Sequence, residues 1–213
     1  MRNKKVGKYM CGRYYVDDDM AREIEKLIRQ VDEKMRKAEN IHLQAGDIHP
    51  SESAPVIAAE HNDLCCRWQR WGFSGFNGKQ LIFNARSETA LEKKMFKESV
   101  EHRRVVVPAT WFYEWNKNKE KNIFYRKNQP VLYMAGIYNR YQDEDRFVIL
   151  TTAANESVKP VHDRMPLLLD QDEIKEWLFE DNLTEALLQK TPALLERETD
   201  FEQMSLFPVE NSR

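Results

Sequence analysis

The sequence predicts one α+β domain whose centre is built mainly from strands. The chain has 213 residues, which is long enough for one well-buried core. Between residues 41 and 152, short apolar and β-branched segments alternate with turn residues, a pattern typical of strands. Stretches with helical spacing lie before and after this region, and no repeat, low-complexity tract or linker divides the chain.

The first expected elements are a short strand and a long helix. Residues 13–16 form an aromatic and β-branched run, and Asp17, Asp18 and Asp19 then supply residues that favour the start of a helix. Apolar side chains follow at three- and four-residue spacing, as in an amphipathic surface helix. These are Met20, Ile24, Leu27, Ile28, Val31 and Met35.

Seven strands and three further helices are expected after this helix. The strands are residues 55–59, 64–71, 81–83, 105–107, 110–115, 131–138 and 147–152. One helix is expected at about 88–99, and two follow near 171–179 and 184–189, where Asp170 and Thr184 are capping-type residues. Residues 1–9 are interpreted as an extension or propeptide, and 205–213 as a loose tail.

Charge and composition exclude several classes of protein. The 33 basic and 35 acidic side chains give a net charge of −2, so a contact with nucleic acid has to be a local patch. The longest apolar runs, such as residues 131–138, are too short to cross a bilayer, and residues 1–9 lack the apolar stretch of a signal peptide. We therefore expect a cytoplasmic protein without a membrane partner.

Cysteine and glycine usage predicts that the protein needs neither a metal nor a cofactor. The three cysteines are Cys11, Cys65 and Cys66, an odd and sparse set that fits a reducing compartment. The adjacent pair lacks the CxxC spacing of structural zinc sites. The seven glycines form no loop of the kind that cradles phosphates.

Four compact segments carry residues capable of chemistry. They are Met10-Cys11-Gly12-Arg13, Asn84-Ala85-Arg86-Ser87-Glu88-Thr89, Phe112-Tyr113-Glu114-Trp115 and His162-Asp163-Arg164-Met165-Pro166. If Cys11 became the amino terminus, it would carry a thiol and an α-amine on adjacent carbons. Ordinary pKa values of about 8.5 and about 7.7–8.0 leave part of each group nucleophilic at neutral pH. Such an aminothiol captures aldehydes.

The same residue types also have structural interpretations. Free cysteines are often buried, which is the interpretation we give to Cys65 and Cys66. Isolated histidines and the tryptophans Trp68, Trp71, Trp111 and Trp115 can equally belong to surface or core. For Arg13 and Glu88 a salt bridge that fixes the conformation is as good an interpretation as a substrate contact, and Glu88 is left out of the predicted site.

In their order along the chain, the four segments resemble those of the SOS-response-associated peptidase (SRAP) family, over about residues 10–169. The resemblance implies an SRAP domain at 10–204 with a barrel-like central sheet flanked by helices. It also implies a protein that recognises abasic sites in single-stranded DNA. In this family the exposed cysteine, here Cys11, forms a thiazolidine crosslink with the ring-opened sugar, after removal of the preceding residues.

The resemblance, together with residue chemistry, suggests a role for each site residue. Cys11 supplies both nucleophiles, and Asn84 holds the amine or the sugar. Glu114 moves protons to and from the imine, and His162 opens the sugar ring and, in the family, reverses the crosslink. The predicted DNA contacts combine phosphate-binding arginines with stacking rings. They are Arg13, Arg67, Trp68, Arg70, Trp71, Arg86 and Arg164, and Arg103 and Arg104 could extend the patch.

Three other activities are compatible with this sequence. Cys11 could cleave the chain at Met10 once, through an N-to-S acyl shift, which would be a self-processing peptidase reaction. A cysteine amidase of the N-terminal-nucleophile kind would use the same freed cysteine, in a closed pocket with oxyanion donors. A module that binds single strands without a covalent step would not need Cys11 at all, and its binding would depend strongly on salt.

Overall fold

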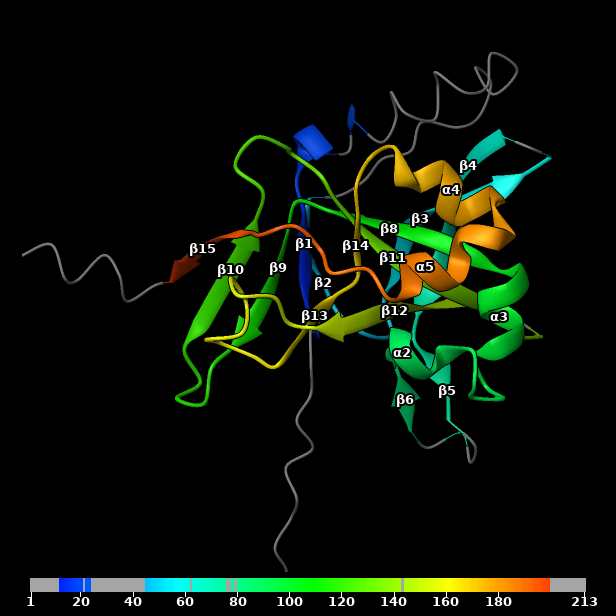
Figure 1. Cartoon of the computed structure of the whole chain (residues 1–213), viewed down its shortest axis with the longest axis horizontal. Coiled ribbons are helices and arrows are strands. Elements are labelled where there is room, and N and C mark those ends of the chain that lie inside the picture. Colours follow the sequence, from blue (N-terminus) through cyan, green and yellow to red (C-terminus); the bar gives the residue numbers. More distant parts are fainter. Residues whose placement is uncertain are drawn as a thin grey trace, which may run out of the picture.

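The computed structural model describes residues 12–20, 22–23, 45–61, 63–75, 78, 80–142 and 144–199. Two large sheets pack face to face, and helices cover the outer side of the larger one (Figure 1). The expected α+β class with a barrel-like sheet is confirmed. The extension at 1–9, the tail at 205–213 and most of the long helix expected after Asp17 lie outside the described residues.

The larger sheet closes into a ring. Its strand order is β13-β12-β4-β3-β8-β11-β14, and β11 also pairs with β12, which closes the circle, while β7 pairs with β12 in parallel. The strands are β3 (Ser53–Glu60), β4 (Asp63–Trp71), β7 (Asn84–Arg86), β8 (Arg104–Ala109), β11 (Leu132–Arg140), β12 (Asp145–Ala153), β13 (Arg164–Pro166) and β14 (Leu168–Leu169). Every residue of β8 is buried, as expected for a β-branched strand in the middle of a covered sheet.

The smaller sheet carries the first of the four motifs next to the third. Its order is β15-β10-β9-β1-β2, all antiparallel. The strands are β1 (Tyr14–Val16), β2 (Gly46–Ile48), β9 (Trp111–Trp115), β10 (Lys121–Tyr125) and β15 (Glu196–Thr199). A separate ribbon joins β5 (Phe73–Ser74) to β6 (Leu81–Ile82). All the strands expected from the sequence are present, with ends shifted by a few residues.

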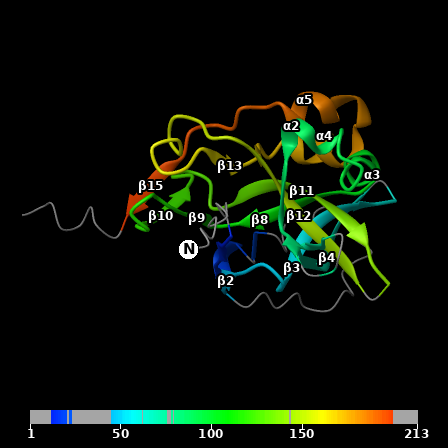
Figure 2. The same cartoon turned by 90° about the horizontal axis from the view of Figure 1, so that it is seen from below.

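The helices lie on one side of the ring (Figure 2). They are α2 (Ser87–Ala90), α3 (Lys97–His102), α4 (Glu173–Phe179) and α5 (Thr184–Leu188), with a 3-10 turn, η2 (Asp181–Leu183). The last two helices are confirmed, but the single helix expected at about 88–99 is wrong, because α2 and α3 are separated by a turn. Phe96 is buried against Phe73 at 6.1 Å between ring centroids, while the charged residues 92–94 between the helices have no apolar face to bury.

Two hydrophobic clusters hold these layers together. One lies between the two sheets and contains Tyr14, Phe112 and Phe124 from the smaller sheet. The other lies between the ring and the helices and includes Trp177, whose indole N–H donates to the carbonyl of Val105 at 3.0 Å. No helix in the described part of the chain is both long and apolar enough to cross a membrane.

Candidate functional site

The second motif lies at the point where β7 runs into α2. Asn84 and Arg86 pair with Ile149 and Thr151 of β12, and Ala85 between them is buried. Because side chains alternate along a strand, Asn84 and Arg86 share the face opposite Ala85. Arg86 is exposed, and α2 begins immediately after it. The strand therefore presents an amide and an exposed guanidinium on one face.

The fourth motif reaches the same place through an ion pair. Both terminal nitrogens of Arg164 donate hydrogen bonds to the carboxylate of Glu88, and Nη2 lies 2.8 Å from Oε2. The same nitrogen donates to the carbonyl oxygen of Thr151 at 2.5 Å. The hydrogen bonds from Arg164 hold the pKa of the Glu88 carboxyl below its usual value. Arg164 is thus committed to Glu88 and Thr151, so the prediction that it is a free phosphate contact does not fit this geometry.

His162 is held by the turn that leads to Arg164. It is 8% exposed, and its Nδ1 lies 3.0 Å from the backbone nitrogen of Arg164, which donates to it. The carboxylate of Asp163 and the carbonyl of Arg164 lie 3.3 and 3.2 Å from the same ring nitrogen. We infer from this pattern that the neutral ring carries its proton on Nε2.

Glu114, in the third motif, is a buried carboxylate on the core-facing side of the smaller sheet. It is 2% exposed and alternates with Tyr113, so it shares the face of Phe112, a core residue. Asn122 on β10 is its partner in the register and is equally buried. A buried carboxylate is costly unless its surroundings are polar, and the equally buried Asn122 is a polar neighbour in the register.

Gly12 connects the first motif to the other residues. The register of β1 with β9 pairs Tyr14 with Phe112, and one step further the Tyr113 amide donates to the carbonyl of Arg13 at 3.1 Å. Continuing the same register brings Gly12 opposite Glu114. A Cβ on Gly12 would lie 3.9 Å from the ring of Phe83, the residue before Asn84. Cys11, the predicted nucleophile, lies outside the described residues.

Arg13 lies on the outer face of the smaller sheet. Its Nη1 is 3.4 Å from a carboxylate oxygen of Asp47, and its guanidinium lies 5.4 Å from the ring centroid of Trp115. The Tyr113 hydroxyl donates to Asp47 at 2.9 Å, and burial together with this carboxylate raises the pKa of Tyr113 to about 12. Arg13 is therefore anchored by a carboxylate and aromatic rings next to the Gly12 position.

Of the two tryptophans predicted as DNA contacts at residues 67–71, the structure exposes one and buries the other. Trp68 is 52% exposed, whereas Trp71 is fully buried and donates its indole N–H to the carbonyl of Phe83 at 2.8 Å. A fully buried ring has no face for a base, so the prediction of DNA stacking for Trp71 is wrong. The arginines are paired, Arg67 with Glu60 at 2.9 Å and Arg70 with Glu144 at 2.6 Å.

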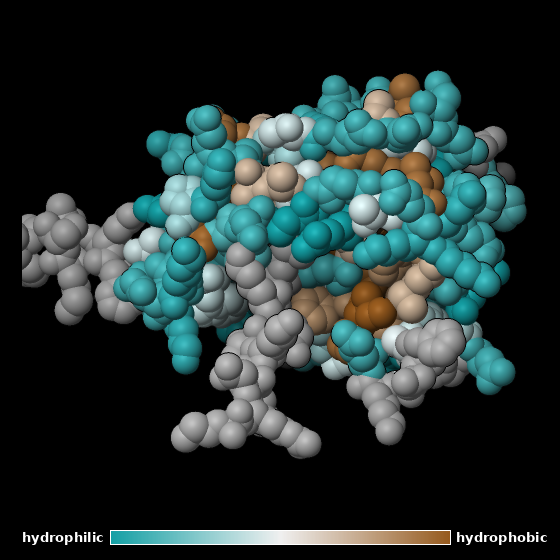
Figure 3. Space-filling view, turned by 60° about the horizontal axis from the view of Figure 1, so that its bottom comes forward, coloured by the Kyte–Doolittle hydropathy of each residue, from teal (hydrophilic) through white to brown (hydrophobic). Residues whose placement is uncertain are grey.

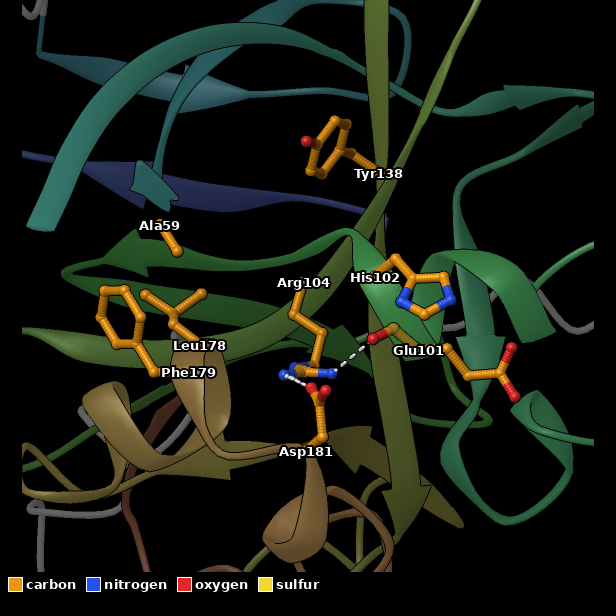
Figure 4. A pocket seen from close by; sticks show the side chains of 8 residues that line it. All are labelled: Ala59, Glu101, His102, Arg104, Tyr138, Leu178, Phe179 and Asp181. Carbon is orange, nitrogen blue, oxygen red and sulfur yellow. Dashed lines mark hydrogen bonds and ion pairs between the residues drawn. The ribbon is translucent and has the colours of Figure 1, made fainter. Parts of the chain in front are cut away.

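Arg103 and Arg104 are also not part of an exposed basic patch. Arg104 is buried, and it donates to the carbonyl oxygens of Trp177, Val100 and Glu101 and to the Asp181 carboxylate. It lines a cavity of about 270 Å³ together with residues of α3 and α4 (Figure 4). Apart from Arg104, none of the residues considered for the site lines this cavity.

The face that carries α2 is shown in Figure 3, in which the lower edge of Figure 1 is turned toward the reader. Hydrophobic residues are exposed near the centre of this face, and hydrophilic residues surround them. The sequence contains no local signal for the contact of Thr151 with Arg164. For Glu88 a salt bridge was one of the two interpretations, and the pair with Arg164 confirms it.

Comparisons with known proteins agree with the four motifs. The sequence profile of the family described as SOS response associated peptidase (SRAP) matches residues 10–212. "Abasic site processing protein YoaM" of Bacillus subtilis is 29% identical over 197 residues, which covers 84% of this chain and 84% of the relative. "Abasic site processing protein YedK" of Escherichia coli is 33% identical over 119 residues, 52% of this chain and 54% of YedK.

A solved structure shows the same fold. The crystal structure of a protein from Bacteroides thetaiotaomicron superposes with a TM-score of 0.71 at 23% identity, covering 89% of this chain and 91% of the other. A structure from Bordetella bronchiseptica gives a TM-score of 0.70 at 22% identity, covering 89% of this chain and 99% of the other. With a profile match to residues 10–212 of a 213-residue chain, the protein belongs to the SRAP family.

Proposed function

We propose that this protein recognises abasic sites in DNA and bonds covalently to them through Cys11 once Cys11 is the amino terminus. The observation that carries the proposal is the position of Gly12, which is opposite Glu114 in the register and where an added Cβ would lie 3.9 Å from the ring of Phe83, the residue before Asn84. A residue bonded to Gly12 starts within one Cα step, about 3.8 Å, of that position. Family membership and the printed names of the relatives support the same substrate.

The proposed reaction joins an aldehyde to an aminothiol. An abasic sugar opens from its hemiacetal to an aldehyde, and the α-amine of Cys11 adds to the aldehyde carbon. Loss of one water gives an imine, and the Cys11 Sγ then adds to the imine carbon, closing a five-membered thiazolidine ring. The thiol proton ends on the ring nitrogen. The net change is the loss of one water, and no oxidant or metal is required.

The proton transfers need acids and bases, which the described residues supply. Glu114 is the candidate for moving protons at the imine, because it is buried at the end of the core where Gly12 lies. His162 is the candidate for opening the sugar ring: as the imidazolium it gives the Nε2 proton to the ring oxygen, and the Nδ1–H that remains can donate to the Arg164 carbonyl or the Asp163 carboxylate. Asn84 offers an amide to the amine or the sugar.

We propose single-stranded DNA as the form that is bound. Trp68 exposes about half of its ring surface, and Arg86 is exposed on the face it shares with Asn84. Stacking on an aromatic ring and a local positive charge are the two features that unpaired strands use. The net charge of −2 keeps this attraction local instead of general.

Cys11 has to lose residues 1–10 before it can react in this way. We propose self-cleavage: the Cys11 Sγ attacks the carbonyl carbon of Met10, a thioester forms, and the amide nitrogen leaves as the α-amine of Cys11. Water then hydrolyses the thioester and restores the thiol. The alternative is translation from Met10, in which case removal of one methionine suffices.

The test is a denaturing gel of the protein incubated with single-stranded DNA that carries one abasic site. Both the full chain and the chain beginning at Met10 are used, with Cys11→Ala as the loss variant and Cys66→Ala as the matched control. We expect a denaturation-resistant band from the parent and from Cys66→Ala, and none from Cys11→Ala. No band from a protein whose intact mass shows Cys11 at the terminus would overturn the proposal and favour the amidase.

Comparing the two starting points tests the processing step. If the full chain also forms the band and its mass shows the loss of residues 1–10 in purified protein, self-cleavage is supported. If only the chain beginning at Met10 reacts, self-cleavage is refuted, while the crosslinking proposal stands.

A further inference from the structure

We propose that Glu88 is a positioning residue that sets the orientation of His162 through Arg164. The inference rests on the proposed function, since it concerns the proton transfers assigned to His162. Glu88 lies on α2 and Arg164 on β13, 76 positions apart in the chain. The pair therefore ties two of the four motifs together.

The chain of contacts from Glu88 to the ring is short. Both terminal nitrogens of Arg164 donate hydrogen bonds to the carboxylate of Glu88. Arg164 also donates to the carbonyl of Thr151, a fully buried residue of β12. These hydrogen bonds fix the position of the Arg164 side chain. Its backbone N–H donates to Nδ1 of His162 at 3.0 Å. Holding Arg164 therefore holds the group that fixes the imidazole ring.

The turn can accommodate the ring in both protonation states. In the neutral ring, Nδ1 accepts from the Arg164 amide, and Nε2 carries the proton. In the imidazolium, Nδ1 no longer accepts from the Arg164 amide, and its N–H can instead donate to the Arg164 carbonyl at 3.2 Å or to the Asp163 carboxylate at 3.3 Å. A ring that gains and loses protons needs such a partner in each state, and all of these partners belong to residues 163 and 164.

The ion pair itself points to a positioning role more than to stability. Glu88 is 42% exposed at its side chain, and ion pairs near the surface contribute little to the free energy of unfolding. A carboxylate on a face that binds DNA would also repel phosphate unless it were neutralised. Glu88 is neutralised by a two-bond contact with Arg164, an arrangement that fixes direction as well as charge.

The experiment is a double-mutant cycle on the rate of crosslink formation. The variants are Glu88→Gln, His162→Ala and the two combined, each in protein whose intact mass shows Cys11 at the terminus. Glu92→Gln is the matched control, because Glu92 is an exposed glutamate just after α2 and has no place in the site. Rates are measured over a range of concentrations of single-stranded abasic DNA, and the urea midpoint of each variant is recorded.

We expect Glu88→Gln to lower the rate at saturating DNA about tenfold, which is within the range by which a misplaced acid or base slows a reaction. The DNA concentration for half-maximal rate should not rise, and Glu92→Gln should match the parent. In the His162→Ala background, Glu88→Gln should change the rate less than twofold, because the residue that it orients is absent.

Two results would overturn the inference. One is an unchanged rate in Glu88→Gln, and the other is the same fold-loss with and without His162, which would mean that Glu88 acts independently of the ring. Failure of the proposed function looks different, because the parent and Glu92→Gln would then form no crosslink either.

Discussion

The sequence predicted that Trp68 and Trp71 both contact DNA, whereas the structure exposes Trp68 and buries Trp71. Replacing the two residues one at a time tests this difference. Both residues lie on β4, but only Trp71 is in the core, where it contacts Tyr14, Phe83 and Phe147. A buried tryptophan removes about 150–250 Å² from water, which at about 25 cal/mol per Å² corresponds to about 4–6 kcal/mol. We expect Trp71→Ala to lower the free energy of unfolding by about 4 kcal/mol, within the range measured for such truncations.

Trp71→Phe is a milder variant that can still be measured if Trp71→Ala fails to fold. It keeps a ring in the core but removes the indole donor to the carbonyl of Phe83. This carbonyl still accepts from the Ile149 N–H at 3.1 Å, so the lost hydrogen bond should cost about 0.5–1.5 kcal/mol. Trp68→Ala, in contrast, should change stability by less than about 1 kcal/mol and weaken binding to single strands by about 1–3 kcal/mol.

Urea unfolding followed by circular dichroism gives the stabilities, and fluorescence anisotropy with a labelled single strand gives the affinities. The reasoning would be refuted if Trp71→Ala kept the parent's urea midpoint while losing DNA affinity. Equal stability losses for the two tryptophans would refute it as well. The first result would mean that Trp71 is accessible to DNA, and the second that the two tryptophans do not differ in burial.

Three further outcomes follow from the described contacts. First, the pKa of Glu88 is lowered in the folded state, so its ion pair adds stability above the pH where the unfolded carboxyl ionises and loses it as pH falls through the folded pKa. The stability difference between the parent and Glu88→Gln should therefore shrink between neutral pH and about pH 3, as followed by urea midpoints. Second, Arg86→Ala should weaken DNA binding and reduce the slope of log affinity against log salt by about 1, and an unchanged slope would remove Arg86 from the phosphate contacts. Third, burial and then the neighbouring Cys65 raise the pKa of Cys66 to about 12, so its thiol should resist alkylation at pH 8 until the protein is unfolded. Mass spectrometry of iodoacetamide-treated protein checks this, and rapid labelling of Cys66 in the folded state would contradict it.

The parts of the fold that sequence predicts well are those with a strong local pattern. The runs at 55–59 and 105–107 are apolar with β-branched residues, and both lie within observed strands, β3 and β8. In α4 the buried residues Ile174, Trp177 and Leu178 have the helical spacing that predicted a helix there. In each case the sequence within one element is enough.

Elements that depend on a distant partner could not be predicted in the same way. Strand β15 reads Glu-Arg-Glu-Thr, with no apolar alternation, and it forms because it pairs with β10. Strand β10 was not among the strands expected from the sequence, yet Lys121 pairs with Trp115, and Asn122 is buried beside Glu114. Propensity does not encode such pairings, because the partner strand supplies the hydrogen bonds.

In the candidate site, too, some residues could be predicted from the sequence and others could not. The order of motifs was enough to name Asn84, Glu114 and His162, and the structure gives each of them a defined place. The pairing of Arg164 with Glu88 and the burial of Trp71 could not be predicted, because both depend on which face of a strand meets another element.

Intact mass spectrometry of the DNA adduct tests the central claim most directly. We predict a product whose mass equals the protein beginning at Cys11 plus the abasic oligonucleotide minus one water, since closing a thiazolidine releases one water from aldehyde and aminothiol. Trypsin cleaves after arginine, so digestion should leave the DNA on the peptide Cys11-Gly12-Arg13. A DNA adduct on Cys65 or Cys66, or a product that retains residues 1–10, would contradict the account.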